Sequence, residues 1–290
     1  MGGFLRRHKR VIPYALLAPG LLWLILFYVL PGFQMLLTSF WSGTLETGYE
    51  FALSNISNYS DALTKYSAQF LRSILYGGLA TLLTFAISYP LAYTIAFRGG
   101  RYKNLLLFLV VAPFFTSFLL RTISWKIILG DTGILLGPLK DMGLLPDEFR
   151  LLATPIAVIF GIAYNFLPFM TLPIYVSLEK VDKRLVEAAE DLFATSFGAF
   201  RRVTFPLSLP GVFAGSLLTF IPAMGDYVNA QLLGNPDTTM IGNVIQNQFL
   251  TQNNYPTASA LSFLLMAGIL IAVGVYARLL GTDELTAGGV

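Results

Sequence analysis

The densest group of ionisable side chains in this sequence lies between residues 180 and 202. Three carboxylates, Glu187, Glu190 and Asp191, are followed by the adjacent pair Arg201 and Arg202. Acid–base or metal chemistry at such a cluster usually draws on histidine or cysteine as well. The chain has no cysteine and a single histidine. We therefore predict no catalytic residue and no metal site, and we expect this charged segment to contact another molecule.

The composition of the whole chain shows which solvent surrounds most of it. Of 290 residues, 55% are hydrophobic and only 12% are charged, and the mean hydropathy is +0.67. A soluble domain has about 25% charged residues, so lipid is the expected solvent. The histidine, His8, lies in a basic amino-terminal tail. The net charge of +3 does not indicate nucleic acid, because the basic residues follow the membrane topology instead.

Six apolar stretches are long enough to cross a bilayer, which takes about 20 residues of helix. They do not alternate in the way of strands, and a chain in lipid must satisfy its backbone hydrogen bonds internally. We therefore predict an all-α integral membrane protein with six transmembrane helices. The stretches are residues 13–40, 73–97, 104–129, 152–178, 205–226 and 256–278.

Lysine and arginine set the orientation of these spans. Thirteen of them fall on the side that holds both termini and the 180–202 segment, against six on the other side. The basic side is normally cytoplasmic, so both termini are predicted to be cytoplasmic. The first span is too long for a cleaved signal peptide and is read as a retained helix.

One membrane domain accounts for the chain, and its outer connection near residues 41–68 is expected to contain a short surface helix. The predicted divisions are a basic cytoplasmic tail at 1–12, the first span with its outer loop at 13–68, a transmembrane core at 69–280 and a cytoplasmic tail at 281–290.

Prolines and polar residues within the spans indicate candidates for a translocation pathway. The fourth span, with Pro168 and Pro173, is predicted to be the most interrupted. Asn165 lies near its middle and either lines the path or makes an interhelical hydrogen bond at a packing kink. Asp226, close to the outer mouth, either draws in a cation or is an ordinary interfacial acid. The candidate pathway residues are Trp125, Tyr164, Asn165, Asp226 and Tyr227.

Residues 183–200 are predicted to form one amphipathic helix beside the membrane, capped by Asp182. Its apolar and small side chains recur at helical spacing. A lipid-surface helix is one interpretation. However, Glu187 and Asp191 are poor partners for anionic headgroups, and the alanines suit close docking. The pattern therefore favours docking into a protein groove.

These residues resemble the cytoplasmic loop of binding-protein-dependent ABC importer permeases. Glu187-Ala188-Ala189 matches the start of that loop, and Val203 and Phe205-Pro206 match its end. The family has glycine where this chain has Phe193, which puts the geometry of the turn in question. Residues 121–133 and 225–243 resemble spermidine/putrescine importer permeases, most like the first of the two permeases, and the resemblance covers about residues 10–280.

The resemblance implies a type I ABC importer permease fold with a coupling helix between the fourth and fifth spans. It also implies a plasma membrane location in a prokaryote and the following partners: a second homologous permease, two ATPase subunits and an extracytoplasmic solute-binding protein. ATP and Mg would bind on the ATPase, because this chain has no phosphate loop and no cofactor of its own. The implied coupling residues are Glu187, Ala188, Ala189, Asp191, Leu192, Phe193 and Phe197.

Three alternatives remain open at this point. The solute of such an importer could be iron or an anion instead of a polyamine. An ion-gradient-driven secondary transporter is a second possibility, although the deep spans lack the ionisable groups that such proteins use. An integral membrane enzyme would need a cluster of reactive groups at one membrane face, and the sequence shows none.

Overall fold

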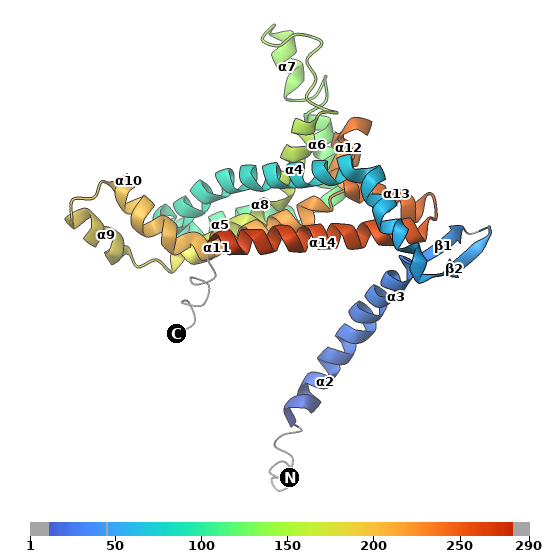
Figure 1. The fold of residues 1–290 in the computed structure, drawn as a ribbon. Helices are drawn as coiled ribbons and strands as arrows, with labels where there is room; N and C mark the ends of the chain where they lie inside the picture. The colour runs from blue at the N-terminus through green and yellow to red at the C-terminus, as the bar shows by residue number, and fades with distance from the viewer. Residues whose placement is uncertain (1–11, 45, 281–290) are drawn as a thin grey trace. The chain divides into compact units, whose positions relative to one another are not determined.

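The computed structural model describes residues 12–44 and 46–280 (Figure 1), and the chain divides into two compact units. The first unit consists of residues 1–65 and 247–264, and the second of residues 66–246 and 265–290. Apart from Ile12, the two predicted cytoplasmic tails lie outside the described residues.

The first unit contains the amino-terminal helices and a β-hairpin. Three helices run through both units: α4 (Ser57–Tyr93), α13 (Ile241–Leu250) and α14 (Tyr255–Leu280). The elements of the first unit alone are α2 (Ile12–Leu24), the π-helical η1 (Ile25–Val29), α3 (Leu30–Thr38), β1 (Trp41–Thr44), β2 (Gly48–Phe51) and the 3₁₀ turn η2 (Leu53–Ile56).

The outer connection contains a β-hairpin and then the expected short helix, residues 57–65, which a kink at Tyr66 separates from the rest of α4. β1 and β2 pair antiparallel, with Trp41 opposite Phe51. Gly43 and Gly48 adopt φ values of 107° and 81°, which other residues rarely reach,. Asn58 then donates from Nδ2 to the carbonyls of Ser39 and Trp41, each at 2.9 Å. Asn58 therefore ties the hairpin to the start of α4.

The first predicted span is a candidate membrane helix whose apolar side chains are exposed. It runs from Leu16 to Thr38 with a mean hydropathy of 2.0, and none of its most apolar stretch is buried. An apolar helix with such exposed side chains is stable only in lipid or against another protein.

The second unit is built around two long helices that lie side by side, α8 (Pro155–Glu179) and α11 (Phe205–Met224) (Figure 1). The other elements are η3 (Thr94–Arg98), η4 (Gly100–Tyr102), α5 (Lys103–Val111), η5 (Ala112–Phe115), α6 (Phe118–Ile128), α7 (Leu136–Asp141), α9 (Lys183–Asp191), α10 (Ser196–Ala199), η6 (Phe200–Thr204), α12 (Val228–Leu233) and η7 (Pro236–Thr238).

Small residues let α8 and α11 approach closely. A Cβ atom added at Gly211 would lie 2.4 Å from the carbonyl oxygen of Pro173, and one at Gly215 would lie 3.0 Å from that of Met170. Close backbone contact of this kind is how helices associate in lipid, where the hydrophobic effect does not drive them together.

The main interruption occurs in a different span from the one predicted. α8 continues through Pro168 and Pro173 as a single helix, so the expected break in the fourth span is wrong. The third predicted span, residues 104–129, instead bends by 94° between η5 and α6. Pro113 starts a 3₁₀ turn, and Thr116 and Ser117 then take extended ψ values of 154° and 136°. The described residues therefore contain five helices suited to spanning, or six if this bent pair is one span.

A side-chain hydrogen bond ties α8 to α4 between the two prolines. The hydroxyl of Thr171 bonds to the Leu167 carbonyl at 2.8 Å and to Ser88 Oγ on α4 at 2.9 Å. Prolines in membrane helices are tolerated where neighbours satisfy the backbone groups around them.

Candidate functional site

The charged segment forms an elbow, which we define as residues 183–204, comprising α9, α10 and η6. Its start agrees with the prediction, since Asp182 Oδ1 accepts a hydrogen bond from the Arg184 amide at 3.0 Å. The rest of the elbow differs from the prediction, because α9 ends at Asp191 and a separate helix, α10, begins at Ser196. The predicted single helix over residues 183–200 is therefore wrong.

A tight turn at Phe193 breaks the helix. Phe193 adopts φ 65°, in the left-handed region. Its amide donates to the Glu190 carbonyl at 2.9 Å, and the Ala194 amide donates to the Ala189 carbonyl at 3.0 Å. This pair of bonds is the Schellman motif that ends many helices, usually with glycine at the left-handed position. The turn is therefore present even though phenylalanine replaces the glycine of the resembling family.

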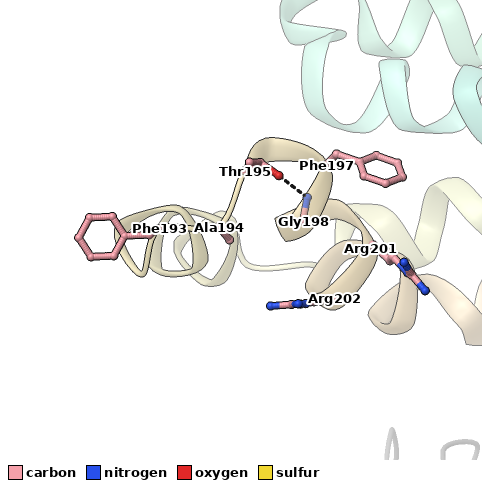
Figure 2. A pocket seen from close by; sticks show the side chains of 7 residues that line it. All are labelled: Phe193, Ala194, Thr195, Phe197, Gly198, Arg201 and Arg202. Carbon is pink, nitrogen blue, oxygen red and sulfur yellow. Dashed lines mark hydrogen bonds between the residues drawn. The ribbon is translucent and has the colours of Figure 1, made fainter.

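A hydroxyl cap starts the second arm of the elbow. Thr195 Oγ1 accepts from the Gly198 amide at 3.1 Å, as Figure 2 shows. Threonine at this position satisfies one of the free amides at the beginning of α10. The hydrophobic spacing continues across the turn, and it therefore predicted one continuous helix in place of a stop at Phe193 and a restart at Thr195.

The charges of the elbow are exposed and have no ionic partner within the described residues. Glu187, Glu190, Asp191, Arg201 and Arg202 are all on the surface. The ion pairs of the described chain join other residues. Unpaired charges of both signs on one short segment suit contact with a complementary protein surface.

The elbow also exposes large apolar side chains. Leu192 is 81% exposed, Phe193 99% and Phe197 72%. Residues of the second arm, including Phe197, Arg201 and Arg202, line an open hollow of about 690 Å³ together with Phe193. Figure 2 shows the Phe193 ring pointing away from the rest of the protein, while Arg201 and Arg202 lie toward the other end of the hollow. Of the remaining predicted coupling residues, Ala188 is exposed and Ala189 is half-buried on α9.

An aromatic cluster, formed by Tyr89, Tyr93, Phe197, Phe200 and Phe205, joins the elbow to the long helices. The Phe200 ring lies 5.8 Å from that of Tyr89, 6.1 Å from that of Phe205 and 6.3 Å from that of Phe197. Tyr89 also shares a 2.8 Å hydrogen bond with Ser208 on α11. Packed rings transmit displacement because interiors of this density are hardly compressible.

At the other end of the α8–α11 pair (Figure 1), α6, α8 and α12 share a buried amide network, formed by Thr122, Asn165, Asp226 and Asn229. Asn165 Nδ2 donates to Asn229 Oδ1 and to Thr122 Oγ1, each at 3.1 Å. Asn229 donates its backbone amide and its Nδ2 to the two carboxylate oxygens of Asp226, at 2.8 Å and 2.6 Å. A Cβ at Gly161 would lie 2.7 Å from Asn229 Oδ1, so glycine allows the two helices to meet there.

This network accounts for the burial of Asp226, which is only 7% exposed. Burial raises the pKa of the Asp226 carboxyl, and the hydrogen bonds from Asn229 and the Val228 amide oppose that rise. Both oxygens are occupied by Asn229, so Asp226 orients α12 in this conformation.

The structure brings some of the predicted pathway residues together. Trp125 and Tyr164 pack edge to face with ring centroids 5.3 Å apart. Asn165 and Asp226 are joined through Asn229, whereas Tyr227 is 41% exposed, and no hydrogen bond from its hydroxyl is seen among the described residues. Sequence reasoning missed Asn229 and Thr122. A signal for Asn229 was available in the sequence. An aspartate near the start of a short helix often accepts a hydrogen bond from the amide three residues later, and Asn229 lies three residues after Asp226,.

Arg121, which precedes Thr122 of this network, is a buried cation. It is 8% exposed, and its guanidinium lies 4.8 Å from the centre of the Phe114 ring and 5.8 Å from that of Phe118. Its Nε atom has no hydrogen-bond partner among the described residues. Stacking on aromatic rings partly compensates for the lost hydration of a cation.

Comparison with known proteins identifies the family. Residues 88–280 match the family described as binding-protein-dependent transport system inner membrane component. The chain is 42% identical over 257 residues to the spermidine/putrescine transport system permease protein PotB of Haemophilus influenzae, covering 88% of this chain and 90% of the relative. It is 37% identical over 255 residues to PotB of Escherichia coli, covering 87% and 92%.

More distant relatives share the fold or part of the chain. The permease of Haloferax volcanii described as a probable molybdenum ABC transporter permease is 27% identical over 213 residues, or 73% of this chain and 74% of the relative. A bacterial ABC transporter that imports the acidic polysaccharide alginate has the same fold, with a TM-score of 0.75 at 20% identity over 96% of this chain and 98% of that one. A structure of a bacterial alginate ABC transporter in complex with a periplasmic protein bound to an alginate pentasaccharide matches with a TM-score of 0.74 at 19% identity, over 96% of this chain and 98% of that one.

These matches confirm the resemblance that the charged loop suggested, and with it the type I permease fold. The chain belongs to the family of inner membrane components of binding-protein-dependent transport systems.

Proposed function

We propose that this chain is a permease subunit of an ATP-driven importer whose solutes are the polyamines spermidine and putrescine. The observation that supports the solute is the 42% identity to a permease named for those two polyamines, extending over most of both chains. The family membership favours this function over an ion-gradient-driven transporter.

We infer a division of labour among subunits. Two separate ATPase subunits would bind ATP and Mg and hydrolyse the nucleotide, and this chain would bind no cofactor and catalyse no reaction. A second homologous permease would complete the path, and an extracytoplasmic binding protein would deliver the solute. The family description, which specifies a binding-protein-dependent system, supports the last of these.

The elbow and both termini would face the cytoplasm. The excess of lysine and arginine on that side supports this topology,. An ion pair between Lys103, after the second predicted span, and Glu179, at the end of the fourth, supports placing these two connections on the same side. The elbow is then on the side where nucleotide is available.

In this proposal the ATPase displaces the elbow, and the aromatic cluster transmits this displacement to the long helices. Glu187, Ala188, Ala189 and the residues up to Phe197 would contact the ATPase. Displacement of α9 and α10 would act on Phe200, which touches α4 through Tyr89 and α11 through Phe205. The long helices would then exchange inward-open and outward-open arrangements, which nucleotide binding selects between.

The candidate pathway combines aromatic faces with amides. Trp125, Tyr164 and Tyr227 would attract ammonium groups through cation–π contacts, each worth about 0.5–2 kcal/mol. Asn165 has a buried oxygen, Oδ1, without a hydrogen-bond partner among the described residues. Asp226 would bind a cation only if Asn229 first broke one of its two hydrogen bonds to the Asp226 carboxylate.

Uptake by a reconstituted transporter tests this function. The complex that copurifies with the chain is placed in proteoliposomes with the binding protein and labelled spermidine. We expect uptake that requires ATP and is abolished by Glu187→Lys, because the reversed charge would face the ATPase. Glu46→Lys, the same charge change on another exposed residue, is the matched control and should transport normally. Uptake driven by an ion gradient without the ATPase would overturn the proposal.

Import of an anion is the second candidate function, and Arg121 is the observation that favours it. A buried cation beside the amide network is an unusual neighbour for a polyamine and a natural one for an anion. Competition separates the two: excess putrescine should suppress labelled spermidine uptake, and excess molybdate or sulfate should not. The reverse pattern would favour the anion importer.

A further inference from the structure

Phe193 combines two features that are unfavourable in the isolated chain. Its backbone is left-handed at φ 65°, a conformation that strains any residue with a Cβ atom and is rare for bulky ones,. Its side chain is 99% exposed, the highest value among the exposed large apolar residues of the described chain. Glycine at this position would avoid both costs while keeping the Schellman turn.

The neighbouring aromatic residue of the elbow differs in this respect. Phe197 is also exposed, but its ring stacks on Phe200 with centroids 6.3 Å apart. No ring contact of Phe193 occurs within the described residues, and Figure 2 shows its ring directed outward from the turn. The ring of Phe193 therefore contributes nothing to the packing of the described chain.

We propose that Phe193 is a specificity anchor, inserted into an apolar pocket of the ATPase subunit that docks on the elbow. This inference rests on the proposed function and adds a property of the partner. The ATPase that serves this chain has a pocket for one aromatic ring, and an ATPase adapted to a glycine at this position would lack that space. Phe193 thereby restricts which ATPase the permease accepts.

The charges around Phe193 complete the description of the partner surface. Glu190 and Asp191 precede it on α9, and Arg201 and Arg202 line the same hollow. None of the four has an ion-pair partner in the described part of the chain. The partner pocket is therefore expected to have basic side chains on the α9 side and acidic ones on the side of the arginines.

A lipid surface fits these charges less well. Anionic headgroups would attract Lys183, Arg184, Arg201 and Arg202 but would repel Glu187, Glu190 and Asp191, which lie directly beside the exposed Phe193 turn,. A protein pocket can satisfy both signs, since its charges are fixed at separate positions.

Glycine substitution gives opposite predictions for folding and for association. Phe193→Gly removes the backbone strain, so the purified permease should unfold at the same temperature or higher. The same change removes a buried ring from the interface and should weaken association with the copurifying ATPase about 10- to 100-fold. Phe193→Tyr keeps the ring and the strain, and its association should stay within about threefold of the original.

Ala153→Gly is the matched control. Ala153 is exposed and also left-handed, at φ 62°. Its replacement relieves the same kind of strain without removing an aromatic ring, so ATPase association should not change. A Phe193→Gly chain that binds the ATPase as tightly as the original would overturn the inference, as would a Phe193→Tyr chain that binds as weakly as Phe193→Gly.

A fluorescent label distinguishes the ATPase from lipid as the surface that receives residue 193. The chain has no cysteine, so Phe193→Cys takes a single environment-sensitive label. We expect a blue shift when the ATPase is added to permease in nanodiscs. A blue shift that depends on anionic lipid and precedes the ATPase would overturn the inference. If the original chain recruits no ATPase, the proposed function fails as well. If it does recruit one and Phe193→Gly makes no difference, only the inference fails.

Discussion

The elbow and the amide network lie at opposite ends of the same pair of helices and treat their charges in opposite ways. In the network, Asp226 is buried and both of its oxygens accept hydrogen bonds from Asn229. In the elbow, seven charged side chains are exposed and have no ion-pair partner among the described residues. Most polar atoms of the network are satisfied within one chain, Asn165 Oδ1 excepted, whereas the charges of the elbow are not paired within the described residues. This difference indicates which end awaits a partner.

The comparison leads to a general expectation. Substitutions in the network should lower the stability of the permease whether or not an ATPase is present. Substitutions on the surface of the elbow should leave stability unchanged and affect only the assembled transporter.

The largest effect is expected at the network. Asp226→Ala leaves the backbone amide and the Nδ2 group of Asn229 buried without acceptors. Each buried unsatisfied group costs about 1–3 kcal/mol, so we expect a loss of about 2–4 kcal/mol in the free energy of unfolding. Thermal unfolding of the purified permease in nanodiscs measures it. An unchanged melting temperature would show that the network does not hold α12 in place.

A somewhat smaller loss is expected at the contact between α8 and α11. Gly211→Ala places a methyl group against the Pro173 carbonyl, and the helices must separate to accept it. Overpacking of this kind costs about 1–3 kcal/mol. Gly268→Ala on α14 is the control, because its Cβ would meet nothing within 4 Å. Equal effects of the two substitutions would argue against a close helix contact at Gly211.

Phe200 joins the elbow to the long helices α4 and α11. Phe200→Leu keeps most of the apolar volume but removes aromatic contacts with Tyr89, Tyr93 and Phe205, each worth about 0.5–1.5 kcal/mol,. We expect a modest loss of stability together with a reduced ratio of spermidine transported to ATP hydrolysed. A normal ratio would show that movement leaves the elbow by another route.

The smallest effect on stability is expected on the elbow surface. Arg202→Ala should change the free energy of unfolding by less than about 0.5 kcal/mol, because the side chain is exposed and unpaired. The same substitution should weaken ATPase association, more strongly at low salt than at high salt. An isolated permease destabilised as much as by Asp226→Ala would contradict the distinction between the two regions.

The sequence predicted the membrane helices well because hydropathy depends on composition over about 20 residues. It located the elbow correctly because the unusual charges of residues 182–202 stand out in an apolar chain. It failed where local backbone geometry decides the outcome. The break at Phe193 was concealed by continuous helical spacing, and phenylalanine is not a residue that normally signals a left-handed turn.

The prediction of a broken fourth span from its prolines was also wrong. Pro168 and Pro173 suggested a broken fourth span, but Thr171 and Ser88 provide side-chain hydrogen bonds beside them. The bend near Pro113 depends on the extended conformations of Thr116 and Ser117. The partners in the amide network are distant in sequence, such as Asn165 and Asn229, and no spacing rule brings them together.

Labelling from each side of the membrane tests the central claim, that the elbow is a cytoplasmic surface covered by the ATPase. The cysteine-free chain allows Glu190→Cys on α9 and, for comparison, Met142→Cys, which is exposed between α7 and α8. We predict that an impermeant maleimide labels Glu190→Cys only in inside-out vesicles stripped of ATPase, and that adding the ATPase back protects it, whereas Met142→Cys is labelled in spheroplasts. Labelling of Glu190→Cys in spheroplasts, or equal labelling with and without the ATPase, would contradict the account.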